Sequence, residues 1–212
     1  MPRICRRDFA AKCDTLSTMV RAILFDCFGV LAEDGWSPFK KQYIDNPRKS
    51  AEISALGKAV DEGRRTYEDM IRGTAHVAHV GESVVRAAVE RRVPNERLLE
   101  YIRSELRQSY KIGMLSNASY DVTQLLFTPD QMALFDTVVL SYDVGLTKPD
   151  PAMYILAADR LGVAAAECIM VDDKASHCAG AIAVGMQAVE YENMSQFTHE
   201  VQDMLAAAGQ AA

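Results

Sequence analysis

The chain has 212 residues, of which 49% are hydrophobic and 25% are charged, a composition typical of one globular α/β domain with room for a small inserted lobe. The formal net charge of −6 argues against a sequence-independent nucleic-acid binder, which is normally basic. No apolar run reaches the roughly 18–20 residues that cross a bilayer, so we expect neither a nucleic-acid nor a membrane partner.

The first 18 residues carry several arginines but lack the apolar segment of a signal peptide. We therefore expect residues 1–18 to form a loose N-terminal extension before Met19. The five cysteines are an odd number and form no CxxC pair, which favours reduced thiols and a cytoplasmic location. The sequence does not fix the oligomeric state, and we expect a monomer or a homodimer.

The first strong pattern is the apolar run VRAILF at residues 20–25, which ends abruptly at Asp26 and predicts a buried parallel strand. Residues 36–93 then show many charges and apolar residues at helical spacing, without a strand pattern. We interpret this stretch as a small all-helical lobe. The expected division is a core of residues 19–34 and 94–212, with residues 35–93 inserted as a helical cap.

Strand and helix patterns alternate after the lobe. The expected strands are residues 111–115, 137–140, 168–171 and 187–189. The expected helices are one starting at Pro94-Asn95, one over 122–135 broken near Pro129, one over 151–161, the small-residue stretch ASHCAGAIAVG and a C-terminal helix. Residues 141–150 (SYDVGLTKPD) are expected to be a loop, and AAAGQAA a frayed tail. The alternation predicts a Rossmann-like parallel sheet flanked by helices.

Polar residues follow three of these strands where each strand ends, namely Asp26, Ser116-Asn117 and Asp172-Asp173. In parallel α/β sheets, ligands bind outside the carboxyl ends of the strands. The placement therefore predicts a site at this edge of the sheet.

The residue types at this edge indicate a chemistry. Three carboxylates in one crevice repel one another unless a cation lies among them, and an oxygen-rich site suits Mg²⁺. Lys148, in the segment GLTKPD, adds a positive charge that can hold a phosphate or steady a carboxylate. Ser116 and Asn117 offer donors for transferring oxygens. These are the parts that phosphoryl transfer through an aspartyl-phosphate requires.

Four segments resemble, in order, the four motifs of the haloacid dehalogenase superfamily. AILFDCFGVL is similar to the first motif with Asp26 as nucleophile, and IGMLSNAS to the second with Ser116. LTKPDPAMY resembles the third motif with Lys148, and CIMVDDKASHCAGAIAVGM the fourth with Asp172-Asp173. The helical stretch after the first motif resembles the cap of the subfamily that includes haloacid dehalogenases and the phosphatase domain of soluble epoxide hydrolase.

The resemblance implies a Mg²⁺-dependent hydrolase that cleaves the phosphate ester of a small phosphorylated metabolite. Asp26 would attack phosphorus and bind Mg²⁺ together with the backbone carbonyl of Phe28. Asp173 would ligate the metal directly, and Asp172 would act through water or as a supporting partner. Ser116 and Asn117 would hold phosphoryl oxygens. Lys148 would neutralise the charge that develops during transfer.

One position departs from the pattern of most phosphatases in this superfamily. They carry a second Asp two residues after the nucleophile, as acid for the leaving group and base for water, whereas this chain has Phe28. General acid–base help of this kind typically raises the reaction rate about 10²–10⁴-fold. A phosphatase without it would act on a substrate with a good leaving group or use another acid, for which Glu33, Asp34 or a cap residue are candidates.

Two alternatives stay open. The first is a metal-independent 2-haloacid dehalogenase, whose first motif D-x-Y-G-T also lacks the second Asp. In those enzymes an Asn and an Asp stand at the positions of Lys174 and His177, and small polar residues replace the Asp172-Asp173 pair. The second is a catalytically weak member that binds a metabolite or partner through its cap. We expect His177 to be exposed or to support the acidic pair rather than to bind the metal.

Overall fold

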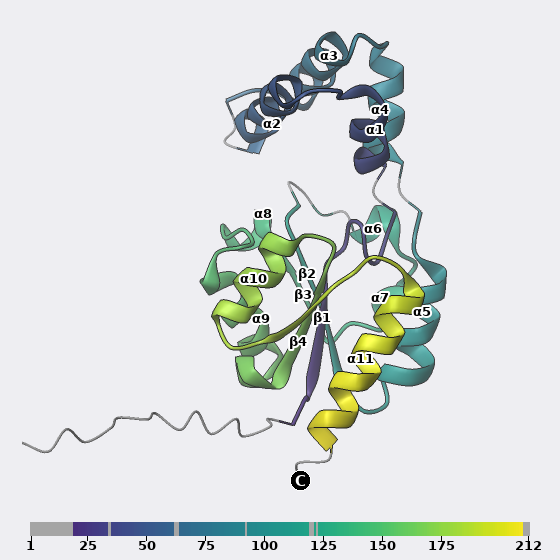
Figure 1. The fold of residues 1–212 in the computed structure, drawn as a ribbon, viewed down its shortest axis with the longest axis vertical. Coiled ribbons are helices and arrows are strands. Elements are labelled where there is room, and N and C mark those ends of the chain that lie inside the picture. The colour runs from purple at the N-terminus through teal and green to yellow at the C-terminus, as the bar shows by residue number, and fades with distance from the viewer. Residues whose placement is uncertain are drawn as a thin grey trace, which may run out of the picture.

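The computed structural model describes residues 19–33, 35–61, 64–91, 93–118, 121 and 123–209. The extension expected at residues 1–18 and the candidate acid Asp34 lie outside the described residues. The chain forms a lower lobe built around a sheet and an upper lobe of helices (Figure 1).

The lower lobe contains a parallel sheet in the order β3-β2-β1-β4-β5. Its strands are β1 (Ala22–Phe25), β2 (Lys111–Ser116), β3 (Thr137–Leu140), β4 (Cys168–Asp172) and β5 (Gln187–Glu190). The Rossmann-like parallel sheet expected from the sequence is thus confirmed. The chain leaves β1 toward β2 and β3 and later returns to the other side of β1 for β4 and β5. The topological switch point, where such sheets bind ligands, is therefore at the carboxyl end of β1.

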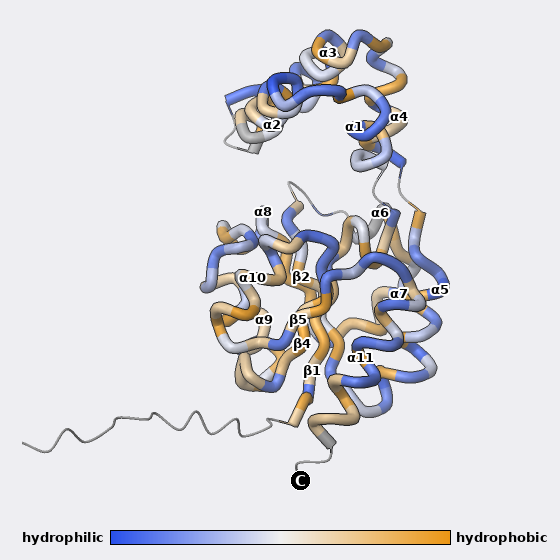
Figure 2. The backbone as a smooth tube through the Cα atoms, viewed as in Figure 1, coloured by the Kyte–Doolittle hydropathy of each residue, from blue (hydrophilic) through white to orange (hydrophobic). Residues whose placement is uncertain are grey.

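Helices cover both faces of the sheet because side chains alternate along each strand. Ile23 and Phe25 pack with the helices on one face, and Ala22 and Leu24 with those on the other. The first face is covered by α5 (Glu96–Tyr101), the π-helical turn η1 (Ile102–Leu106) and α11 (Met194–Gly209), and the second by α9 (Pro151–Leu161) and α10 (Ala175–Ala183). Figure 2 shows that the strands are the most hydrophobic part of this lobe.

The break that we expected near Pro129 is present, because α6 (Thr123–Leu126) and α7 (Pro129–Met132) are separate helices and Thr128 caps the second one. Three other details differ from the sequence expectations. The loop expected at 141–150 begins with a helical turn, α8 (Ser141–Val144), and a 3₁₀ turn, η2 (Ala165–Glu167), precedes β4. The last helix continues to Gly209, into the tail that we expected to be frayed. No helix in the described part of the chain has both the length and the apolar character to span a membrane.

The upper lobe consists of α1 (Trp36–Tyr43), α2 (Pro47–Asp61), α3 (Tyr67–Ala78) and α4 (Glu82–Glu90). It has a small hydrophobic cluster of its own, centred on Phe39, Ile71 and Val85. The ring of Phe39 stacks on Trp36 with centroids 5.3 Å apart. We call this lobe the cap, because it stands over the carboxyl ends of the strands in Figure 1.

Two chain segments join the cap to the core, and they are hydrogen-bonded to each other. The amide of Glu33 donates to Val93 O at 2.8 Å, and the amide of Asn95 donates to Leu31 O at 2.8 Å. The side chain of Asn95 also donates to the backbone oxygen of Val30, at 3.0 Å. The cap is therefore held on a short two-stranded neck rather than on two independent linkers.

Candidate active site

The polar residues at the strand ends come together because the strands are parallel and in register. Phe25 pairs with Val171, and the next amide, that of Asp26, donates to Val171 O at 2.8 Å. Asp26 is therefore level with Asp172, the last residue of β4. On the other side of β1, β2 ends at Ser116. All three side chains belong to the same edge of the sheet.

Lys148 connects the two carboxylates. Its side chain is fully buried, with Nζ 2.9 Å from Asp26 Oδ1 and 2.5 Å from Asp172 Oδ2. Asp26 Oδ1 also accepts a hydrogen bond from the backbone amide of Cys27 at 2.7 Å. Asp26 and Asp172 are themselves buried. The ammonium group thus balances two carboxylates that burial would otherwise disfavour in their charged form.

Asn117 fixes the segment that carries Lys148. Its Oδ1 accepts from the Lys148 amide at 2.8 Å, and its Nδ2 donates to the Lys148 carbonyl at 3.0 Å. The Lys148–Pro149 peptide is cis. In the structure the side-chain amide of Asn117 holds the backbone of Lys148, and its expected contact with phosphoryl oxygens stays a prediction.

His177 belongs to the site through its contact with Asp172. Its side chain is buried, whereas we considered an exposed one, and Nδ1 is 3.0 Å from each carboxylate oxygen of Asp172. The backbone oxygen of His177 accepts from the buried hydroxyl of Tyr154 at 2.8 Å, which ties α10 to α9. The expectation that His177 supports the acidic pair fits this geometry. The sequence signal for this role was the position of His177 early in a helix, shortly after the acidic pair Asp172-Asp173.

Asp173 lies close to the loop that follows Asp26. Gly29 has a φ of 86°, and a Cβ built on it would be 2.5 Å from Asp173 Oδ2. The Asp173 carboxylate is therefore packed against the loop that follows Asp26. The side chain of Phe28 in this loop is half-buried against the core cluster.

Ser116 contributes a hydroxyl with unused hydrogen-bonding capacity. Its side chain is fully buried, and its Oγ has no hydrogen-bond partner among the described residues. A buried hydroxyl without a partner is costly, so its presence at this strand end points to a partner supplied by a ligand.

The electrostatics differ between the two carboxylates that Lys148 bridges. Burial raises the pKa of Asp26, and the charge of Asp172 adds to the rise against the opposing effect of Lys148. Burial also acts to raise the pKa of Asp172, but the hydrogen bond from His177 and the charge of Lys148 outweigh it, so this pKa is lowered. The surroundings therefore disfavour the charged form of Asp26 and favour the charged form of Asp172.

The donor set suits a hard divalent cation. Asp26, Asp172 and His177 each bring a potential ligand atom within 4.8 Å of the others. Nδ1 of His177 already contacts both oxygens of Asp172, so the cluster offers carboxylate oxygens and Nε2 of His177 as donors. Oxygen donors are the ligands that Mg²⁺ prefers, and Asp173 offers a further carboxylate nearby. These residues fit the expected ion.

With this geometry established, a family comparison identifies the class of protein. The model of the haloacid dehalogenase-like hydrolase family matches residues 20–185. The chain belongs to this family of hydrolases, and the resemblance of its four motifs is confirmed.

Two curated relatives are phosphatases by name. The phosphatase MT3486 of Mycobacterium tuberculosis is 27% identical over 156 residues, which span 73% of this chain and 66% of that protein. The putative phosphatase YhcW of Bacillus subtilis is 25% identical over 189 residues, spanning 82% of this chain and 84% of that protein.

Solved structures of the family share the fold. The HAD family enzyme bt-2542 of Bacteroides thetaiotaomicron aligns with a TM-score of 0.63 at 20% identity, over 87% of this chain and 99% of that one. The same enzyme has been solved in complex with magnesium and inorganic phosphate. A dehalogenase aligns with a TM-score of 0.58 at 20% identity, over 82% of this chain and 86% of that one.

Proposed function

We propose that the chain is a Mg²⁺-dependent phosphatase that hydrolyses the phosphate ester of a small metabolite through an aspartyl-phosphate on Asp26. The observation that carries the proposal is the contact of Lys148 Nζ with both Asp26 and Asp172 at the switch point of the sheet. An ammonium group held there screens a nucleophilic carboxylate and the phosphate that approaches it.

Each residue then has a defined task. Asp26 attacks phosphorus, while Ser116 Oγ donates to a phosphoryl oxygen and so gains the partner that it lacks. Asn117 acts by holding the backbone of Lys148 in place. Asp26, the carbonyl of Phe28 and Asp173 would hold Mg²⁺, with Asp172 as a supporting ligand. When bound, the ion supplies positive charge that offsets the repulsion between carboxylates and phosphate.

The comparisons support the same reaction class. Both curated relatives are named as phosphatases, and the Bacteroides enzyme binds magnesium and inorganic phosphate. The dehalogenase among the solved structures shares the fold, but the acidic pair and its lysine favour phosphate chemistry in this chain. The cytoplasmic location and the monomeric or homodimeric state stay predictions from the sequence.

The test is hydrolysis of 4-nitrophenyl phosphate by the purified chain, with Mg²⁺ and with EDTA. We expect metal-dependent turnover that Asp26→Asn abolishes. The matched control is Asp159→Asn, which removes an exposed carboxylate on α9 and should leave turnover unchanged. A folded protein that releases halide from a 2-haloacid but no phosphate from any ester would contradict the proposal.

A further inference from the structure

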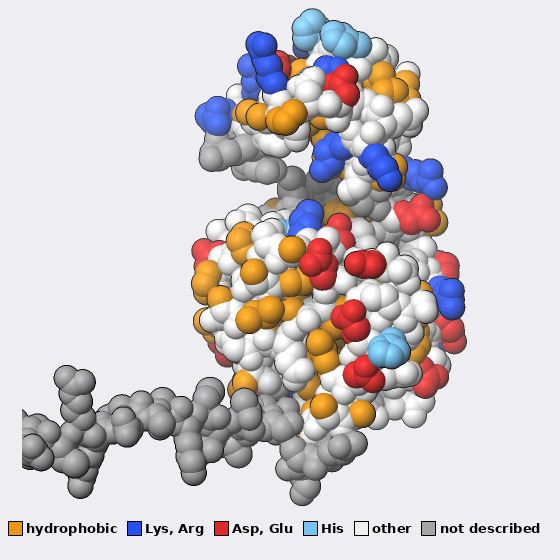
Figure 3. Space-filling model, in the orientation of Figure 1, with side chains coloured by type: hydrophobic (Ala, Val, Ile, Leu, Met, Phe, Trp, Pro, Cys, Tyr) orange, Lys and Arg blue, Asp and Glu red, His pale blue; other side chains and the backbone are white. Residues whose placement is uncertain are grey.

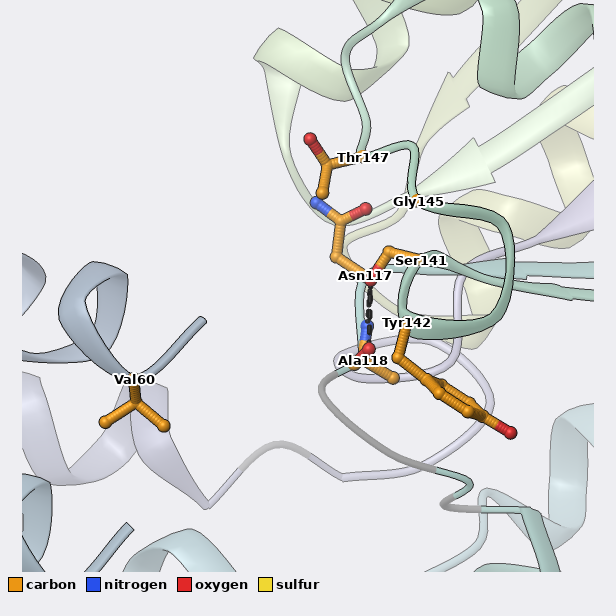
Figure 4. A pocket seen from close by; sticks show the side chains of 7 residues that line it. All are labelled: Val60, Asn117, Ala118, Ser141, Tyr142, Gly145 and Thr147. Carbon is orange, nitrogen blue, oxygen red and sulfur yellow. Dashed lines mark hydrogen bonds between the residues drawn. The ribbon is translucent and has the colours of Figure 1, made fainter. Parts of the chain in front are cut away.

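A pocket between the cap and the core is lined by residues next in sequence to Ser116 and Lys148. It has a volume of about 580 Å³, the size range of small-molecule sites. Val60 of α2 faces it from the cap, and the remaining described lining comes from the ends of β2 and β3 and the segment before Lys148 (Figure 4). These residues are Asn117, Ala118, Ser141, Tyr142, Gly145 and Thr147. Figure 3 shows that the surface is hollowed between the two lobes.

The pocket has one aromatic side chain in its described lining, and two of its polar side chains are already hydrogen-bonded. The aromatic residue is Tyr142, which is 49% exposed and, in Figure 4, extends away from Val60. The hydroxyl of Ser141 donates to Ala118 O and accepts from Ala118 N, both at 2.9 Å. The amide of Asn117 is bound to the backbone of Lys148. The hydroxyls of Tyr142 and Thr147 are further polar groups of the lining, beside the aromatic ring of Tyr142 and the apolar side chains of Val60 and Ala118. A flat aromatic group that carries a polar atom suits such a mixed lining.

The described lining offers no positive charge to an anionic leaving group. None of its described lining side chains is charged. At its edge, desolvation raises the pKa of Tyr142, and the carboxylates of Asp121 and Asp143 add to that rise because they lie near the phenol. A leaving group that carried its own negative charge would meet these carboxylates. An uncharged leaving group avoids that repulsion.

The described residues supply no acid for the leaving group at the position where the superfamily has one. Phe28 stands there, and its ring is packed against the core. The candidate Glu33 is bound to Arg91 at 3.0 Å and lines a different pocket of about 370 Å³ inside the cap, with Phe39 and Tyr43. Among the described residues, Phe28 has no proton to donate and Glu33 is engaged by Arg91, while the candidate Asp34 lies outside the described residues.

We propose that the substrate is the phosphate ester of an uncharged phenol, with its ring in the pocket that Tyr142 and Val60 help to line. This inference rests on the proposed phosphatase function. One feature of such a substrate, the aromatic ring, accounts for two observations. It fits the pocket, and it makes the leaving group a phenol with a pKa of about 10, as in tyrosine, instead of an alkoxide whose parent alcohol is far less acidic.

The reaction balances without an added acid. An Asp26 carboxylate oxygen bonds to phosphorus while the bond from phosphorus to the aryl oxygen breaks. The bonding pair leaves on that oxygen as a phenolate, which takes a proton from solvent. Water then attacks the phosphorus of the aspartyl-phosphate, which releases inorganic phosphate and restores the Asp26 carboxylate. One water is consumed for each ester cleaved.

Three esters separate leaving-group acidity from ring binding: phenyl, benzyl and cyclohexyl phosphate. Phenyl phosphate has the ring and the acidic leaving group, benzyl phosphate has only the ring, and cyclohexyl phosphate has neither. We expect kcat/KM for phenyl phosphate, which reports the step that breaks the ester bond, to exceed that for benzyl phosphate by at least about 10²-fold, the lower end of what a general acid supplies. Phe28→Asp should narrow this gap by raising kcat/KM for benzyl phosphate. Equal kcat/KM values in the wild-type chain would overturn the inference.

Tyr142→Ala tests the ring contact. We expect KM for phenyl and benzyl phosphate to rise by about 3- to 10-fold, the range of an aromatic pair, with little effect on KM for cyclohexyl phosphate. Tyr142→Phe, which keeps the ring, should raise KM less. Ile182→Ala removes another exposed apolar side chain, on α10, and serves as the control. An equal rise for all three esters would refute an aromatic site.

The two proposals fail in different ways. If 4-nitrophenyl phosphate is not hydrolysed with Mg²⁺ by the folded chain, the phosphatase function itself is wrong. If 4-nitrophenyl phosphate is hydrolysed, but phenyl and benzyl phosphate react with equal kcat/KM, only the inference that the leaving group is a phenol is wrong.

Discussion

Replacing Lys148 by Met should destabilise the fold strongly, because it leaves two buried carboxylates without their shared cation. The side chain of Lys148 is fully buried, and those of Asp26 and Asp172 are exposed by 5% and 0%. Removing one partner of a buried ion pair costs about 3–5 kcal/mol, because the remaining charge stays uncompensated. Met retains most of the volume of the lysine side chain, so the loss of stability reports the missing charge rather than lost packing. For a domain of this size the melting temperature should fall by about 6–20 °C.

The same substitution should make stability depend more steeply on pH. Lys148 acts to lower the pKa of Asp26, which burial already raises, so its loss raises that pKa further. A carboxyl group with a raised pKa in the folded state stabilises the fold while it is protonated, and this contribution is lost as pH rises through that pKa. The penalty relative to wild type should therefore be largest at neutral pH and shrink toward acid pH.

The assay is urea unfolding of wild type and Lys148→Met in EDTA, at neutral and at acid pH. Lys41→Met, an exposed lysine of α1, is the control and should change the free energy of unfolding by no more than about 0.5 kcal/mol. Equal stabilities of wild type and Lys148→Met at neutral pH would refute the reasoning. A penalty that stays constant with pH would show that packing, not charge, explains the loss.

Three further substitutions separate function from stability. Gly29→Ala should lower Mg²⁺ affinity, measured by titration calorimetry, and cost about 1–3 kcal/mol in stability, since the methyl group would meet Asp173 at a φ of 86°. Ser116→Ala should leave the melting temperature unchanged or higher, because it removes a buried hydroxyl without a described partner, yet lower kcat by about 10²-fold; a clear loss of stability would contradict this. Glu33→Gln should leave kcat within about 2-fold and stability within about 1 kcal/mol, because its pair with Arg91 is exposed; a large fall in kcat would reveal the missing acid.

The strands could be predicted from the sequence because each is a short apolar run that ends at a polar residue. β3 begins and ends at the predicted residues. β2 and β4 each continue one residue further than predicted, to Ser116 and to Asp172. The carboxyl ends of neighbouring parallel strands must share one edge of the sheet. The contact between Asp26 and Asp172 through Lys148 follows from that topology once the motif order is known.

The partners of these residues could not be predicted in the same way. The bonds from Asn117 to the backbone of Lys148 and from His177 to Asp172 depend on how loops and helices dock in three dimensions. Asn117 offers the same amide to a phosphate or to a peptide group, and only the fold decides between them. The pocket beside Tyr142 likewise depends on the position of Val60 across the gap between cap and core, which no local pattern encodes.

The place of β1 in the sheet has a consequence for how the chain is made. Leu24 of β1 pairs with Gly113 on one side and with Met170 on the other, so the central strand leaves the ribosome long before either neighbour. The helices of the cap contact one another over short sequence distances, and we expect them to form first, since local contacts form faster than distant ones. Until β2 and β4 are translated, the run AILF stays unpaired and apolar. Nascent chains that stop before residue 168 should therefore be the species that chaperones bind.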